Sequence, residues 1–194
     1  MIVARGLERR FGSKRLLAGL DLNVPEGAFV VVTGPNGSGK STLLSLCAGL
    51  LAPTKGTLVV RAERREVGYL AHEPLVYREL TALENLELYG RLYRVPERRE
   101  RIGMLLERFG LWEARHERVS AFSRGMAQRL AFCRVLLHEP ALLLLDEPHS
   151  GLDADACEVV DAELRALAAE RTVVLSTHDP ERLASLATLR LALA

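Results

Sequence analysis

A glycine-rich turn is the first part of the sequence whose residue types and spacing indicate chemistry. Within the stretch VVTGPNGSGKSTLL, residues 34–41 match G-x-x-x-x-G-K-[ST], the pattern of a phosphate-binding loop. Glycines let successive backbone N–H groups turn inward around an anion, and a helix expected to begin near Gly39 points its positive end at the same place. Lys40 then reaches the β- and γ-phosphates, and the Ser41 hydroxyl binds Mg²⁺.

The context of this turn favours a nucleotide site over the alternative, a flexible turn before an ordinary helix. The motif follows a β-branched run at residues 29–33 and precedes an apolar helical segment, as a phosphate loop does. The sequence therefore predicts ATP and Mg²⁺ as ligands. The residues expected at the nucleotide are Gly34, Pro35, Asn36, Gly37, Ser38, Gly39, Lys40, Ser41 and Thr42.

Two acidic residues end the apolar run ALLLLDEP, at Asp146 and Glu147. In a parallel sheet the carboxyl end of a strand borders the ligand crevice. We expect Asp146 to meet Mg²⁺ through its water shell, and Glu147 to polarise the attacking water as general base. The alternative is a solvated junction between strand and loop, which the phosphate loop elsewhere in the chain disfavours.

A second apolar run, VVLSTHDP, has the same layout and ends at His178. An isolated histidine is usually structural. Here the strand is expected beside the acidic strand, so the imidazole of His178 would reach the γ-phosphate and help to hold the water. His178 is therefore the third predicted catalytic residue.

Composition and charge limit the classes of protein. A chain of 194 residues with 48% hydrophobic and 26% charged residues fits one globular domain. The net charge of +1 gives no global electrostatic case for a nucleic-acid partner. Three cysteines, Cys47, Cys133 and Cys157, form no CxxC pair and are expected to be buried thiols. With no leader and no apolar run of spanning length, we expect a soluble cytoplasmic protein.

The order of the elements predicts an α/β fold. Short strands at residues 29–33, 57–60, 142–145 and 172–176 alternate with helical patterns, which favours a mainly parallel sheet. Alternation before Val24 indicates antiparallel edge strands. Residues 73–138 have helical periodicity and no convincing strand.

We interpret this order as one domain over residues 1–194, a P-loop NTPase core with an inserted helical lobe. The core would comprise residues 1–72 and 139–194, and the lobe residues 73–138.

The stretch AFSRGMAQRLAFCRVLLHEPALLLLDEPHSGLD resembles the ABC transporter ATPases. Residues 122–126, the signature segment, are similar to the family's LSGGQ but altered at the first, third and fifth places. Residues 150–153 match the family's D-loop. The resemblance implies ATP hydrolysis coupled to transport across a membrane.

Ser123 and Gly125 open a helix, so their hydroxyl and backbone N–H groups form a second anion site. A chain with two phosphate-binding helix ends can use one on its own ATP and the other on a partner's. We therefore expect a head-to-tail homodimer with ATP between Lys40 of one subunit and Ser123 of the other. The alternative is that this segment is only an N-capped amphipathic helix.

Two site residues follow from the resemblance. His72 stands where the family carries a glutamine that contacts Mg²⁺ or the water, and an imidazole with a pKa near 6.5 would add pH sensitivity. Phe11 stands where an aromatic ring stacks on adenine, although phenylalanine is also a common core residue.

Features within residues 69–86, including HEP and LTALENL, are similar to the ATPase subunit of the haem exporter of cytochrome c maturation. Drug and lipid exporters share such features and remain the alternative. A soluble ABC ATPase of DNA repair or translation, or a module that binds nucleotide without hydrolysing it, is disfavoured.

Transport implies integral membrane permease subunits, with this chain bound peripherally at the cytoplasmic face of the cell membrane. The candidate docking surface is residues 73–89, where Tyr77, Leu80 and Tyr89 are expected to be exposed. Leu83 and Leu86 are expected to pack inside the lobe.

Overall fold

A five-stranded parallel sheet in the order β5-β6-β7-β3-β8 lies at the centre of the computed structural model, which describes residues 1–193. Every neighbouring pair in this sheet is parallel. Continuous apolar runs form its three inner strands, which are almost wholly buried because helices or a second sheet cover both faces. The strands are β3 (Phe29–Thr33), β5 (Val67–Leu70), β6 (Leu142–Asp146), β7 (Thr172–Ser176) and β8 (Leu189–Ala192).

Three further strands form a separate antiparallel sheet in the order β2-β1-β4. They are β1 (Ile2–Phe11), β2 (Lys14–Val24) and β4 (Lys55–Val60). The α/β fold with parallel and antiparallel strands is confirmed, but the antiparallel strands do not lie at the edges of the parallel sheet. Residues 57–60 belong to β4, which pairs with β1. Their apolar run is too short to distinguish a half-buried strand from a fully buried one.

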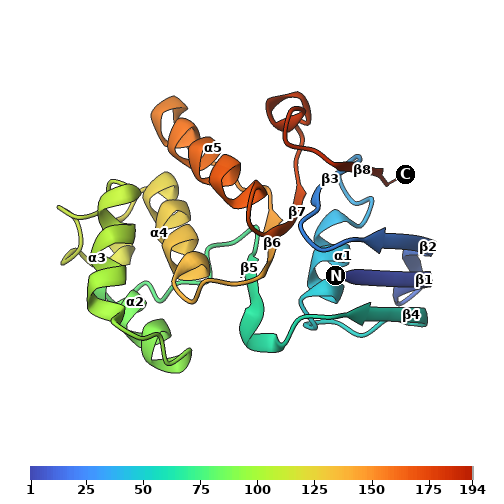
Figure 1. Ribbon diagram of the computed structural model, residues 1–194, viewed down its shortest axis with the longest axis horizontal. Coiled ribbons are helices and arrows are strands. Elements are labelled where there is room, and N and C mark those ends of the chain that lie inside the picture. Colours follow the sequence, from blue (N-terminus) through green and yellow to red (C-terminus); the bar gives the residue numbers. More distant parts are fainter. Residues whose placement is uncertain (194) are drawn as a thin grey trace.

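The described residues also form five α-helices. Figure 1 shows α2, α3 and α4 together at the end of the molecule away from β1, β2 and β4. The helical periodicity predicted between residues 73 and 138 is present, because α2, α3 and α4 all lie there. Within residues 1–193, no helix has both the length and the apolar content that crossing a membrane requires. The helices are α1 (Lys40–Cys47), α2 (Ala82–Leu92), α3 (Arg98–Arg108), α4 (Arg124–Leu136) and α5 (Ala154–Ala168).

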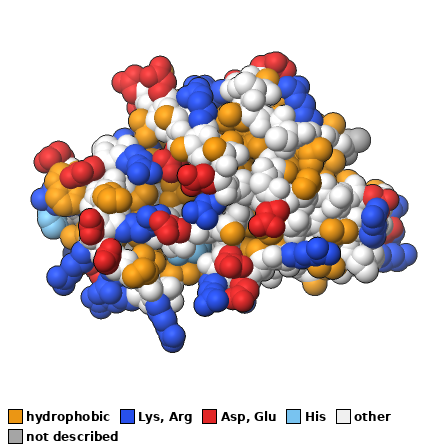
Figure 2. Space-filling view, in the orientation of Figure 1, with side chains coloured by type: hydrophobic (Ala, Val, Ile, Leu, Met, Phe, Trp, Pro, Cys, Tyr) orange, Lys and Arg blue, Asp and Glu red, His pale blue; other side chains and the backbone are white. Residues whose placement is uncertain are grey.

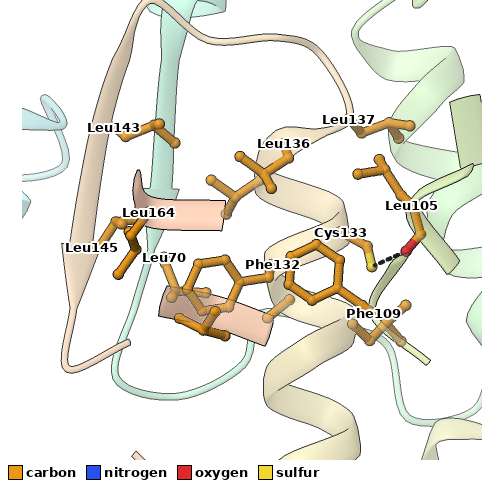
Figure 3. Close-up of a cluster of buried hydrophobic side chains, with 14 of the residues drawn as sticks. Leu70, Leu105, Phe109, Phe132, Cys133, Leu136, Leu137, Leu143, Leu145 and Leu164 are labelled. Carbon is orange, nitrogen blue, oxygen red and sulfur yellow. Dashed lines mark hydrogen bonds between the residues drawn. The ribbon is translucent and has the colours of Figure 1, made fainter. Parts of the chain in front are cut away.

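The parallel sheet separates two hydrophobic clusters, because side chains along a strand alternate between its faces. Val30, Leu144 and Val174 pack with α1 and the antiparallel sheet. Leu143 and Leu145 pack instead with α4, α5 and the helical end (Figure 3). One hydrophobic cluster therefore holds α1, the helix that follows the phosphate loop, and the other holds α2, α3 and α4.

Two of the three cysteines lie inside these clusters, Cys133 in the cluster that contains α4 and Cys47 in the cluster that contains α1. All three are buried and none forms a disulfide. Cys133 donates a weak 3.6 Å hydrogen bond from Sγ to the carbonyl oxygen of Leu105, close to the stacked rings of Phe109 and Phe132 (Figure 3). Burial raises the pKa of Cys47 to about 12, so this thiol stays protonated and packs as a small apolar group.

Asn85 connects α2 to the chain that precedes it. This fully buried side chain accepts a 2.8 Å hydrogen bond from Tyr77 N and donates 2.9 Å bonds to the carbonyl oxygens of Tyr77 and Thr81. Thr81 in turn caps α2 through a reciprocal pair of bonds with Glu84. The segment between β5 and α2 is therefore held by polar contacts that an apolar side chain cannot replace.

Replacing Asn85 by leucine is expected to lower the free energy of unfolding by about 2–4 kcal/mol, because partly buried backbone groups of Tyr77 and Thr81 lose their three hydrogen bonds to this side chain. Chemical denaturation with Glu79→Gln as control measures the effect, since Glu79 is exposed. Equal midpoints for the two variants would contradict this role of Asn85.

Candidate nucleotide site

The phosphate loop joins β3 to α1 and holds its lysine inward. Gly39 precedes the helix with φ of +102°, a left-handed conformation that glycine adopts without strain. The side chain of Lys40 is buried, and its Nζ donates hydrogen bonds of 2.7 Å to Gly34 O and 3.2 Å to Pro35 O. An ammonium group has three protons to donate, so one remains for a ligand.

The loop fits a bound phosphate group on two further observations. The hydroxyl of Ser38 is buried and has no hydrogen-bond partner within the protein. A Cβ atom on Gly34 would lie 2.6 Å from that hydroxyl and 2.5 Å from Leu193 O, so only glycine fits there. Backbone N–H groups can therefore approach an anion closely, and Ser38 has a donor that the protein itself does not use.

The loop opens into a cavity of about 270 Å³ that several separate parts of the chain line. The sequence-predicted residues brought together there come from the phosphate loop, from the ends of β6 and β7, and from the segment after β5. The lining residues are Leu16, Asn36, Gly37, Gly39, Lys40, Ser41, Thr42, His72, Asp146, Glu147 and His178.

Ser176 aligns the acidic pair. Its Oγ donates a 2.6 Å hydrogen bond to Asp146 Oδ1 and accepts a 3.0 Å bond from Glu147 N. The contact follows from strand register, because Asp146 and Ser176 are direct partners in the pairing of β6 with β7. Ser176 was not among the predicted site residues, although a hydroxyl that ends an apolar strand beside the acidic strand is a usable signal.

Glu147 and His178 face each other at the carboxyl ends of β6 and β7. Glu147 Oε1 lies 3.2 Å from His178 Nε2, and this oxygen is buried without an aligned hydrogen bond. Glu147 also has φ of +49°, a left-handed conformation that costs a non-glycine residue about 1 kcal/mol or more. The carboxylate is thus held at a strained turn with an oxygen available to a water molecule.

The oxygen donors for Mg²⁺ lie in the same cavity. Mg²⁺ binds hard oxygen ligands and usually keeps several waters, so it needs few protein groups. Ser41 contributes an exposed hydroxyl and Asp146 a buried carboxylate, of which Oδ1 is bonded to Ser176. This donor set fits Mg²⁺, with Asp146 Oδ2 available to a metal-bound water.

Phe11 lies outside the lining of the cavity. The guanidinium of Arg9 covers one face of its ring at 4.4 Å from the centroid, and the side chain is 46% exposed. It is therefore not a core residue. The stacking of Phe11 on adenine, like the glutamine-like role of His72, stays a prediction.

Ser123 and Gly125 also lie outside the cavity, at the start of α4. Ser123 caps the helix and accepts a 3.1 Å hydrogen bond from Met126 N. Arg124, at an altered place of the signature segment, donates a 2.8 Å bond to Ser150 Oγ of the D-loop. The two segments meet within one chain, a contact that the sequence did not predict.

Together, the phosphate loop, the acidic strand end and the separate signature segment define an ATP-binding cassette on an α/β fold. The model of the ABC transporter family matches residues 17–150. The chain therefore belongs to this family and is an ABC ATPase domain.

Individual relatives agree with this classification. YxlF, an ABC transporter ATP-binding protein of Bacillus subtilis (strain 168), is 40% identical over 185 residues, which are 92% of this chain and 62% of YxlF. The daunorubicin resistance ATP-binding protein DrrA3 of Streptomyces coeruleorubidus is 40% identical over 187 residues, 91% of this chain and 59% of DrrA3. The chain thus spans about three fifths of the length of either relative.

Among solved structures, the ATP-binding cassette MJ0796, a dimer in a post-hydrolysis state bound to ADP and phosphate, superposes with a TM-score of 0.90. The two chains are 30% identical, and the match covers 100% of this chain and 94% of MJ0796. The fold described above is therefore that of an ABC cassette.

The Ser38→Ala variant is expected to bind ATP about tenfold more weakly while its free energy of unfolding stays within about 0.5 kcal/mol of the wild-type value. The reason is that the Ser38 hydroxyl has no partner in the protein and would bond only to the ligand. Titration calorimetry and thermal unfolding measure the two quantities, with Ser185→Ala, an exposed serine, as control. Unchanged affinity would show that the hydroxyl does not meet the nucleotide.

Proposed function

We propose that this chain binds ATP with Mg²⁺ and hydrolyses it to supply the energy of a membrane exporter. The observation that carries the proposal is the single cavity lined by Lys40, Ser41, Asp146, Glu147 and His178. Phosphate-binding, metal-binding and water-activating groups are thereby placed within reach of one nucleotide, which is the requirement for phosphoryl transfer to water.

Each residue has a distinct part in the proposed reaction. Mg²⁺, when bound, neutralises charge on the phosphate oxygens. Lys40 binds the phosphates with the donor that its bonds to the loop leave free. Glu147 accepts the proton of the attacking water, while His178, 3.2 Å from its carboxylate, holds that water against the γ-phosphate. His72 lines the same cavity and would contact Mg²⁺ or the water in place of the family's glutamine.

The proposed assembly is a head-to-tail homodimer. Ser123 and Gly125 lie at the start of α4 and do not line the cavity of their own chain, which supports their use on the nucleotide of a second copy. The dimeric state described for MJ0796 supports a dimer of this chain. Integral membrane permease subunits would bind the pair at the cytoplasmic face, contacting residues 73–89.

The proposed docking surface has mixed support from the side chains. Leu75 and Tyr77 are about half exposed, whereas the hydroxyl of Tyr89 is bonded to Leu75 O and Leu86 is fully buried. The apolar groups available to a permease are therefore in the segment before α2.

Two cargo classes are proposed for the exporter. The resemblance within residues 69–86 favours haem delivered for cytochrome c maturation. The name of DrrA3 instead favours a drug such as daunorubicin. An exporter of haem and an exporter of a drug would have different membrane subunits, so identifying the permease that binds this chain would decide between the two cargo classes.

Mixing two inactive variants tests the proposed hydrolysis and dimer together. Lys40→Met lacks a phosphate ligand and Ser123→Arg blocks the partner's pocket, so each alone is expected to lose at least about 90% of ATP turnover. With equal amounts of the two variants, about half of all dimers are heterodimers, and each heterodimer has one intact pocket of two. The mixture is therefore expected to regain up to about a quarter of wild-type turnover, and isolated heterodimers up to about half. Phosphate release from tagged heterodimers measures the rescue.

Glu147→Gln mixed with Lys40→Met is the control, because Glu147 and Lys40 act in the same pocket. Each pocket of that heterodimer lacks either Lys40 or Glu147, so no turnover is expected, although Ser123 is intact in both chains. Verified Lys40→Met and Ser123→Arg heterodimers without turnover would contradict the shared pockets. A wild-type chain that binds ATP without hydrolysing it would contradict the proposed activity.

Cargo is tested by purifying the chain with the membrane proteins that bind it and measuring ATP turnover in lipid vesicles. Haem is expected to raise turnover about threefold or more, while daunorubicin leaves it unchanged. The opposite pattern would identify a drug, and not haem, as the cargo. Absence of any membrane partner would favour a soluble ABC ATPase instead.

A further inference from the structure

A buried carboxylate on α5 joins two loops that carry the proposed hydrolysis residues. Asp161 is 7% exposed. Its Oδ1 lies 2.7 Å from Nε2 of His149, and its Oδ2 accepts a 2.8 Å hydrogen bond from Nε of Arg182. Both oxygens are therefore used, and each by a different segment of the chain.

The two partners of Asp161 lie close in sequence to the proposed catalytic pair. His149 is in the turn that follows Glu147, where Ser150 N donates a 3.0 Å bond to Glu147 O. Arg182 is in the turn that follows His178, and its backbone N donates to the side chain of Asp179. Asp161 itself does not line the nucleotide cavity.

The bonding of this cluster uses both oxygens of Asp161. Arg182 donates to Oδ2, and the imidazole of His149 donates to Oδ1 when its proton is on Nε2. Burial lowers the pKa of His149 despite the opposing effect of Asp161, and Arg182 also lowers it. A neutral imidazole and the Arg182 cation therefore both donate to one anion.

We propose that Asp161 is a positioning residue for ATP hydrolysis, which holds the loop of Glu147 and the loop of His178 in a fixed relation through His149 and Arg182. The proposal rests on the proposed function of the site. Glu147 and His178 lie in the turns that follow the neighbouring strands β6 and β7, so the pairing of these strands does not by itself fix the two side chains. An anchor shared by both turns limits their separate motion and keeps the carboxylate and the imidazole 3.2 Å apart.

A matched control lies on the same helix. Glu163 forms an ion pair with Arg108 of α3, at 3.1 Å, and is also little exposed. It therefore resembles Asp161 in chemistry, burial and helix, but its partner Arg108 belongs to the helical end and not to either loop. Loss of the Glu163 pair removes a contact of α5 without releasing the turns.

The test compares Asp161→Asn with Glu163→Gln in steady-state ATP hydrolysis. In Asp161→Asn the new amide N–H₂ must face one of two donors, so one loop is released. We expect kcat about tenfold lower, with KM and the Kd for ATP within about twofold of wild type. Glu163→Gln is expected to leave kcat within about twofold of wild type.

Two further variants keep the test informative if Asp161→Asn does not fold. Arg182→Gln changes a partly exposed side chain, and it should lower kcat in the same way with the midpoint of thermal unfolding little changed. His149→Ala should also lower kcat, whereas His149→Gln should restore most of it because the glutamine amide can donate to Asp161 in place of Nε2. Rescue by glutamine is a readout that mere loss of packing would not give.

The results separate the inference from the function on which it rests. Wild-type protein without ATP turnover overturns the proposed function. Wild-type turnover with kcat unchanged in folded Asp161→Asn or Arg182→Gln overturns the positioning role alone. Equal losses of kcat in Glu163→Gln and Asp161→Asn would assign Asp161 to stability only, as would His149→Gln behaving like His149→Ala.

Discussion

The parallel pairing of β3, β6 and β7 is the constraint on which the site depends. Parallel strands direct their carboxyl ends to the same edge of a sheet, so the residues that follow each strand meet there. The phosphate loop follows β3, the acidic pair ends β6, and His178 lies just beyond β7. Register then determines the finer placement, because Asp146 pairs with Ser176 and receives its hydroxyl bond. Burial of the sheet on both faces makes this register costly to change.

Much of this arrangement was predictable because its signals are local. The phosphate loop, the apolar strand that ends in Asp146, the apolar strand that ends just before His178, and the helix opened by Ser123 all lie where the pattern placed them. Each depends on a few adjacent residues whose types suffice to indicate the structure. The core and lobe boundaries and the roles of individual site residues remain predictions.

The rest depends on contacts between residues far apart in the chain. A short run such as residues 57–60 can join either sheet, and only its pairing with β1 decides which. The contacts of Arg124 with Ser150 and of His149 with Asp161 have no sequence pattern of their own. Charged side chains of both signs are interspersed over the face shown in Figure 2, so charge composition could not single out these pairs.

The left-handed backbone at Glu147 has a consequence for how this domain tolerates change. Glycine would adopt the same conformation at lower conformational energy, so the residue that gives this turn the least backbone strain has no carboxylate. Fold stability and chemical competence thus favour different residues at one position. Selection of variants for thermal stability alone would therefore favour replacing Glu147, and the selected proteins would lose catalytic activity. A glutamate retained at this position indicates that activity has been kept at a cost in stability.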